Sequence, residues 1–488
     1  MKITPIIGLE IHIQIKTKTK AFCPCSANYF ADPPNTHTCP VCLGLPGSLP
    51  TLNEEFVRRA ILVGLALDPT HTGKNINFKN HFDRKNYFYP DLPKGYQISQ
   101  FYKPLINGGE VKIDLNGKGK IIRIAEAHLE EDAAKSLHEK DCTLVDFNKA
   151  GIPLLEIVSY PDMQSAQEAH IYAQKVQQLI RYLAVSDANI EEGSMRCEPT
   201  VNVKIEENGK TFYTPLAEIK NIASLKAVEQ AIDFEVARQA ALWQETGEVK
   251  SSTNKSTRGW DADKGETFLQ REKEGSADYR YFPEPDIPPL NLDKKTITEI
   301  KKDLPELPDQ KKEKFMKIFG LSLYDATLLT QEHSAALAFE KAVAHSSSPK
   351  QAKFIANFFA GKLISSLGTN WQAIQADRIN PDHYTYLYQA METGAISSTV
   401  AYDVAQKSYQ RNQSPQEIIE KEGLSQISDQ DKLQELAQKV LLENPRAVKD
   451  YAKNPNSIGF LVGQLMRLSA GSANPGLARD ILEKLLKK

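Results

Sequence analysis

The chain has 488 residues, of which 41% are hydrophobic and 25% charged, and its formal net charge is −2. This is the composition of an ordinary globular protein, and the length exceeds the roughly 250–300 residues that one hydrophobic core supports, so we expect two or three domains. No apolar run reaches the roughly 18 residues of a membrane span, and a predicted strand begins by about Ile6, which leaves no room for a signal peptide. We therefore expect a cytoplasmic protein. The near-neutral charge neither requires nor excludes a face that binds nucleic acid.

Up to about residue 290, strand-like runs alternate with turn signals and helical stretches. The predicted strands are Ile6–Ile15, Ile121–Leu129, Ile152–Val158 and Thr200–Ile205, and the predicted helices are Glu54–Leu67 and Gln167–Leu183. This order predicts an α+β domain with a large mixed or antiparallel sheet. The proline-rich segment Tyr281–Pro289 is expected to end the domain, because proline fits neither the interior of a helix nor that of a strand.

Beyond residue 290 the helical signals dominate. Ser414 can cap a helix that has Pro415 in its first position and Glu417 where a capping box requires it, and Leu433, Leu436 and Val440 follow with helical spacing. We therefore expect a catalytic domain at 1–290, an all-α domain at 291–410 and a small all-α tail at 411–488.

Apolar and polar residues alternate along Leu9–Ile15, as in a half-buried strand. The polar positions are Glu10, His12 and Gln14, which therefore share one face. Taken alone, this segment is better explained by a solvated sheet face than by a binding site.

Two cysteine pairs follow this strand. Cys23 and Cys25 form one pair, Cys39 and Cys42 the other, and together they can complete a tetrahedral zinc site. The alternative is four thiols without a ligand. Because four thiolates leave no open coordination position, we expect such a zinc ion to hold a loop in place and to take no part in catalysis.

Two further segments carry acids that could bind a metal ion. Glu156 lies within the buried-looking run Leu154–Val158, where an ionised carboxylate is costly unless a cation or hydrogen bonds compensate it. Glu130, Glu131 and Asp132 are three consecutive acids at the end of a predicted strand. Carboxylate oxygens are ligands that Mg²⁺ prefers, although this triplet could equally begin a solvated helix.

Two polar segments, Asp83–Pro90 and Glu191–Arg196, could bind a ligand. Arg84, Lys85 and Arg196 could neutralise phosphate oxygens or the end of an RNA, and Tyr87 or Tyr89 could stack on a base. Either segment could instead be a surface cluster of ion pairs. The sequence contains no phosphate-binding G-x-x-x-x-G-K-[ST] loop and no set of kinase motifs, so these residues by themselves do not predict the use of ATP.

Several longer motifs occur in a fixed order along the chain. They are Gly8–His12, Cys39–Pro50, Phe82–Pro90, His128–Asp132, Gly193–Arg196, Asp278–Asp286, Gly459–Gln464 and Ala473–Pro475. In sequence and order they closely resemble the motifs of the GatB family, the B subunits of aspartyl/glutamyl-tRNA amidotransferases. The resemblance covers essentially the whole chain.

The resemblance implies a cradle domain distantly similar to the catalytic domain of glutamine synthetase, then a helical domain, then a tail that holds tRNA. It implies that ATP and Mg²⁺ are used in the cradle to phosphorylate the side-chain carboxylate of Glu-tRNA(Gln) or Asp-tRNA(Asn), which ammonia then converts to the amide. By motif position, the resemblance implies that the metal ligands are Glu10, His12, Glu130 or Glu131, and Glu156. It implies that the catalytic residues are Glu10, His12, Glu131 and Glu156. The cysteines resemble those of zinc-bearing members.

In that family ammonia comes from a separate glutaminase. The chain shows no Ser-Ser-Lys amidase signature, so the implied partners are an amidase-type A subunit, a small C subunit and the mischarged tRNA, with no membrane or DNA partner.

Two other functions remain open. One is a non-catalytic scaffold that binds tRNA and has a loop held in place by zinc. Such a scaffold would have no use for an acid in an apolar run. The other is a free-standing ligase that acts on a small amino acid, for which the helical tail would have no use.

Overall fold

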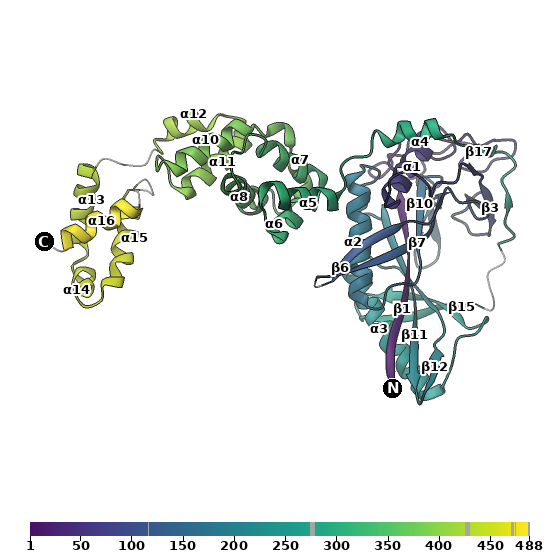
Figure 1. Cartoon of the computed structure of the whole chain (residues 1–488). Coiled ribbons are helices and arrows are strands. Elements are labelled where there is room, and N and C mark those ends of the chain that lie inside the picture. The colour runs from purple at the N-terminus through teal and green to yellow at the C-terminus, as the bar shows by residue number, and fades with distance from the viewer. Residues whose placement is uncertain (116, 274–278, 425–429, 470–472, 474, 487–488) are drawn as a thin grey trace. The chain divides into compact units, whose positions relative to one another are not determined.

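The computed structural model describes residues 1–488 except 116, 274–278, 425–429, 470–472, 474 and 487–488 (Figure 1). Asp278 and Asn474, which belong to two of the motifs above, lie outside the described residues. The chain divides into two compact units, Met1–Leu307 and Pro308–Lys488. The first contains a large mixed sheet, and the described part of the second is helical. The predicted α+β class is thus confirmed, whereas the division into three domains stays a prediction.

The main sheet of the first unit runs in the order β15-β14-β13-β11-β1-β10-β7-β5, with β12 paired to β11 and β6 to β7. Its strands are antiparallel except for the parallel pair β13 and β14. The strands are β1 (Lys2–Gln14), β2 (Lys79–Asn80), β3 (Asp83–Asn86), β4 (Tyr96–Ser99), β5 (Ile106–Asn107), β6 (Glu110–Leu115), β7 (Lys118–Glu131), β8 (Lys135–His138), β9 (Thr143–Asp146), β10 (Pro153–Ser159), β11 (Met195–Glu207), β12 (Lys210–Tyr213), β13 (Ala217–Lys220), β14 (Lys255–Asp261), β15 (Glu266–Lys273), β16 (Phe282–Pro283) and β17 (Leu290–Asn291).

The predicted helices are also present. The first unit contains α1 (Glu54–Leu67), α2 (Ala166–Tyr182), α3 (Leu225–Thr246) and α4 (Lys294–Lys301). The second unit contains α5 (Pro308–Phe319), α6 (Leu323–Leu329), α7 (His333–Ala342), α8 (Pro349–Phe358), η1 (Phe359–Leu363), α9 (Ile364–Ser366), η2 (Trp371–Ala373), η3 (Ala376–Arg378), α10 (Pro381–Glu392), α11 (Ser398–Arg411), α12 (Pro415–Glu422), α13 (Gln430–Glu443), α14 (Pro445–Lys453), η4 (Pro455–Ser457), α15 (Ile458–Leu468) and α16 (Pro475–Leu486).

Side-chain caps explain where several of these helices begin. The Asn53 side chain accepts a hydrogen bond from the backbone N–H of Phe56 at the start of α1. The Ser414 side chain likewise accepts from Glu417, with Pro415 in the first turn of α12, as the sequence predicts.

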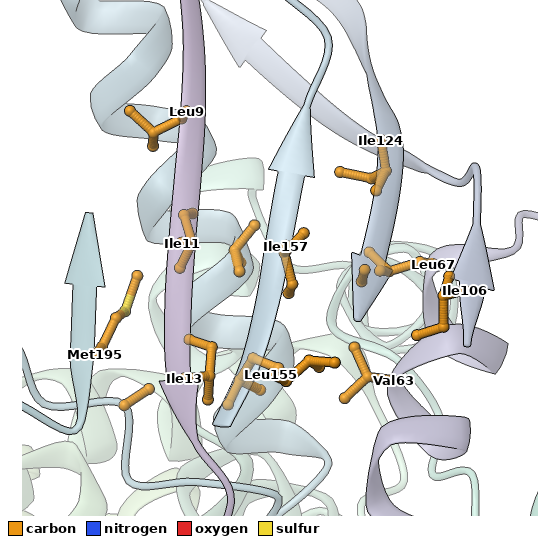
Figure 2. Packing of buried hydrophobic residues seen from close by; sticks show 14 of the residues in the cluster. Leu9, Ile11, Ile13, Val63, Leu67, Ile106, Ile124, Leu155, Ile157 and Met195 are labelled. Carbon is orange, nitrogen blue, oxygen red and sulfur yellow. The ribbon is translucent and has the colours of Figure 1, made fainter. Parts of the chain in front are cut away.

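Strand β1 lies between β10 and β11 and divides the sheet into an apolar and a polar face. Leu9, Ile11 and Ile13 are at most 1% exposed. Figure 2 shows them among side chains of β10 and α1, including Leu155 and Val63. Burial of this apolar area holds the strand in one register, because a shift by one residue would exchange its two faces. The even-numbered residues of β1 must therefore lie on the opposite face.

The last helices of the second unit have an apolar core of their own. It is built around Leu433, Val440, Leu461, Leu465 and Leu482, each at most 1% exposed. This confirms the helical spacing predicted for α13. None of the described helices is long and apolar enough to cross a membrane.

Candidate active site and zinc-binding loop

Neighbouring strands bring a row of acids and imidazoles together on the polar face of the sheet. His12 of β1 lies opposite Glu156 of β10, which in turn lies opposite His128 of β7. On the other side of β1, Glu10 lies opposite Glu198 of β11. We use the name acidic face for this row, which consists of Glu10, His12, His128, Glu130, Glu156, Glu198 and Glu218.

Glu156 lies between the two histidines. Its Oε2 is 3.7 Å from Nδ1 of His12 and 3.4 Å from Nε2 of His128, and the residue is 9% exposed. Burial raises the pKa of Glu156, but the charges of His128 and His12 outweigh that effect and lower it. Burial lowers the pKa of His12, but Glu156 and the hydrogen bond to Glu130 raise it to about 9. The histidines are thus the counter-charges of this carboxylate.

Glu10 lies among carboxylates of like charge. Burial, together with the nearby charges of Glu156 and Glu218, raises the pKa of Glu10 to about 7. A cation bound here would relieve this repulsion.

The potential ligand atoms of Glu10, His12 and Glu156 lie within 4.8 Å of one another, as do those of His128, Glu130 and Glu156. Oxygens on opposite sides of a Mg²⁺ ion are about 4.2 Å apart, so small side-chain movements would suffice to bind it. The residues present fit this ion.

Two of the predicted ligand-binding residues face the same row. Burial opposes the charge of Lys85, but Glu130, Tyr281 and Glu156 raise its pKa well above the ordinary value. The Lys85 ammonium also lies 5.2 Å from the ring centroid of Tyr279 and 6.0 Å from that of Tyr87. Lys85 and Tyr87 therefore lie beside the acidic face, and their role in binding a ligand stays a prediction.

Arg84 is engaged elsewhere. Its guanidinium donates to both carboxylate oxygens of Glu284 at 2.7 and 2.8 Å and to Asp286 at 3.1 Å, and it lies over the ring of Tyr96. Glu284 is 3% exposed. This pairing joins β3 to the proline-rich segment and explains Arg84 without any ligand.

We expect Arg84→Met to destabilise the protein by about 3 kcal/mol, because it leaves the buried Glu284 carboxylate without its counter-charge. Urea unfolding of the variant measures this change, and substitution of the exposed Lys103 by Met is the control. Unchanged stability together with weaker binding of ATP or tRNA would instead support the predicted phosphate-binding role of Arg84.

Glu131 is held away from the potential metal ligands, whereas Arg196 of β11 lies opposite His12 of β1. The Glu131 carboxylate accepts from the Lys94 ammonium and, at 3.0 Å, from the backbone N–H of Ile98. Arg196 contacts Asp132 at 3.3 Å, and Lys149 contacts the same acid at 2.8 Å. The structure thus brings Glu10, His12, Glu130 and Glu156 together but does not bring Glu131 to them.

The four predicted zinc ligands converge. The sulfur atoms of Cys23, Cys25, Cys39 and Cys42 lie within 4.8 Å of one another, and those of Cys39 and Cys42 are 3.9 Å apart. Zn–S bonds of about 2.3 Å in a tetrahedron place the sulfurs about 3.8 Å apart, so the cluster fits a zinc ion. The buried Lys20 ammonium lies 3.7 Å from the Cys42 sulfur and offsets thiolate charge.

The loop between the two cysteine pairs is fastened to the segment before β10. Asn35 accepts from the backbone N–H of Phe147 at 2.8 Å, and Asn148 accepts from that of His37 at 2.7 Å. Lys149 comes next and contacts Asp132. The cysteine cluster is thereby linked to one end of the polar face.

Sequence reasoning missed three members of the acidic face, namely His128, Glu198 and Glu218. His128 belongs to a motif that was recognised, but its role was not assigned. Glu198 alternates with buried residues on β11, and Glu218 stands between Ala217 and Ile219, both buried. Period-two alternation could have identified both, as it did for Glu10.

The chain is similar to known proteins over its whole length. Residues 5–298 match the model of the GatB/GatE catalytic domain, and residues 337–486 match that of the GatB domain. Curated relatives named as B subunits of aspartyl/glutamyl-tRNA(Asn/Gln) amidotransferase include those of Persephonella marina, at 43% identity over 100% of both chains, and Thermotoga maritima, at 42% over 100% of both. The relative from Chlorobium chlorochromatii is 43% identical over 99% of both. The chain therefore belongs to the GatB/GatE family and carries that family's catalytic domain.

Proposed function

We propose that the chain uses ATP and Mg²⁺ to activate the side-chain carboxylate of glutamate or aspartate mischarged onto tRNA, and that a partner glutaminase subunit delivers the ammonia that completes the amide. The acidic face carries this proposal, because buried acids and imidazoles converge there beside Lys85. The names of the relatives supply the substrate class.

The carboxylate must be activated, because ammonia would otherwise have to displace an oxide ion, which is a very poor leaving group. The carboxylate oxygen attacks the γ-phosphorus of ATP, ADP leaves, and an acyl phosphate forms. Ammonia then attacks the acyl carbon and phosphate leaves. Phosphoryl transfer of this kind depends mainly on positioning and on neutralisation of charge.

The chain's own residues would divide this work. Glu10, His12, Glu130 and Glu156 would hold Mg²⁺, which when bound neutralises phosphate oxygens and orients them. The Lys85 ammonium would bind the oxygens of the incoming carboxylate or phosphoryl group. His12 would have to be neutral to act as a ligand, so its imidazole would give up a proton when the ion binds.

A non-catalytic scaffold explains the acidic face poorly. Buried charges of like sign are costly, and Glu10 is held beside other acids with a pKa of about 7. A protein that only bound tRNA would gain nothing from this arrangement.

The deciding experiment measures ATP hydrolysis by the complete complex of this chain with its amidotransferase partners. We expect hydrolysis that depends on Glu-tRNA(Gln), Asp-tRNA(Asn) or both. A complex that makes no ADP with either mischarged tRNA would contradict the proposal.

We propose further that the C-terminal helices α13 to α16 hold the body of the tRNA. Removal of residues 425–488 leaves α12 in place, where Glu422 pairs with Arg411 of α11. Such a deletion removes binding energy shared by the ground and transition states, so we expect KM for the tRNA to rise by about tenfold or more while kcat changes little. Steady-state kinetics measures both, and glutaminase activity is the control. An unchanged KM would mean that these helices serve another purpose.

A further inference from the structure

A second group of buried charges lies on the side of the sheet opposite the acidic face. Thr257 of β14 is the register partner of Glu218, a member of the acidic face, so the next residue, Arg258, points to the other side. Helix α3 covers that side and packs on β11 and β15. The Glu235 side chain of α3 is fully buried there, between the guanidinium groups of Arg238 and Arg258.

Two cations share this one carboxylate. Arg238 donates to its two oxygens at 2.6 and 3.0 Å, and the Arg258 guanidinium lies 3.4 Å from one of them. Glu235 also accepts from Gln239 at 2.9 Å and from Thr267 at 2.8 Å. Burial and the charge of Arg238 outweigh the effect of Glu235 and lower the pKa of Arg258. Among the described residues, the cluster therefore holds one positive charge that no acid compensates.

A cavity of about 220 Å³ lies beside both arginines, which form part of its lining. Each guanidinium keeps a donor nitrogen in reserve. Nε and Nη2 of Arg238 donate to Glu235, and those of Arg258 donate to Thr267 at 2.8 and 2.9 Å. Neither Nη1 group has an acceptor in the part of the chain that the structure describes. The Ser256 hydroxyl offers a further donor in the lining.

The remaining lining is largely apolar and does not supply the missing charge. Leu242, Trp243 and Leu269 contribute apolar walls. Glu248 also lines the cavity, but it is exposed and its carboxylate accepts from Asn254 at 2.9 Å. Guanidinium donors beside apolar walls suit an anion that has an apolar body.

We propose that this cavity binds a small organic oxyanion, a carboxylate or a phosphate monoester. Arg238 and Arg258 hold its charged end, and Leu242 and Trp243 contact its apolar part. Both anions offer oxygens that accept paired hydrogen bonds from a guanidinium, which is the chemistry that the site recognises. The site lies on the other side of the sheet from Glu10 and Glu156 and does not depend on the proposed function.

Binding is measured by calorimetry on the purified full-length chain. Benzoate and phenyl phosphate are the probes, because each joins an oxyanion to a flat apolar ring. Benzamide, which has the shape of benzoate but no charge, is the neutral control. We expect at least one of the two anions to bind at millimolar concentration, and benzamide to bind at least about tenfold more weakly. The anion that binds more tightly identifies the carboxylate or the phosphate ester as the preferred group.

Two variants locate the site. Arg258→Met removes one cation but leaves the buried pair of Glu235 and Arg238 intact, so we expect a folded protein that binds the anion at least about tenfold more weakly. Leu269→Trp places a larger side chain at the cavity without changing either arginine, and it should weaken binding to a similar extent. Leu144→Trp is the matched control, because Leu144 also lies on a strand and is 50% exposed, against 48% for Leu269.

Three results would overturn the assignment. They are no binding of either anion by the wild type, equal binding of benzamide, and unchanged binding by both folded variants. If Arg258→Met does not fold, Leu269→Trp decides. Inorganic phosphate that binds as tightly as phenyl phosphate would contradict the role given to the apolar walls. Absence of tRNA-dependent ATP hydrolysis would contradict the proposed function and leave this site unaffected.

Discussion

Glu156→Gln is expected to lower tRNA-dependent ATP hydrolysis by at least about 10³-fold, or ~4 kcal/mol in the transition state, while the protein remains folded. The amide keeps the shape of the side chain but removes the negative charge between His12 and His128. Both potential metal sites that include Glu156 would lose a charged ligand.

Rates of ADP formation with saturating mischarged tRNA measure this effect. Glu206→Gln is the matched control, because Glu206 lies on β11 of the same sheet but pairs with Lys2 and Lys204 away from the acidic face. Normal turnover by Glu156→Gln would disprove its assignment as a metal ligand. Loss of turnover with loss of the folded state would point to a structural role instead.

Loss of one zinc ligand is expected to have the second large effect. Protein purified under reducing conditions should carry about one zinc per chain, and Cys39→Ser should lose it. Because metal binding adds directly to folding free energy, we expect the variant's thermal midpoint to fall by about 5 °C or more. Hydrogen exchange should become faster in residues 33–38 and 145–148, which are bonded to each other.

Elemental analysis, a thermal melt and hydrogen exchange test this prediction. Cys142→Ser is the control, because Cys142 is exposed and lies outside the cysteine cluster. Wild-type protein without zinc, or a Cys39→Ser variant with the metal content and midpoint of the wild type, would contradict it.

The sequence by itself determined the features that depend on neighbouring residues. Alternation along β1 predicted which side chains share a face, and the Ser414 cap predicted the start of α12. The acid within the apolar run of β10 identified Glu156 as a residue that needs counter-charges. These signals are readable because strand and helix periods relate residues only a few positions apart.

The tertiary structure alone decided which distant groups meet. It paired Arg84 with Glu284, 200 positions away, and Glu131 with Lys94, although both had been predicted at the ligand site from their motifs. It also brought Glu198 of β11 beside Glu10. Strand order and register set these encounters, and they depend on burial of the apolar face across the whole sheet, which no local pattern contains.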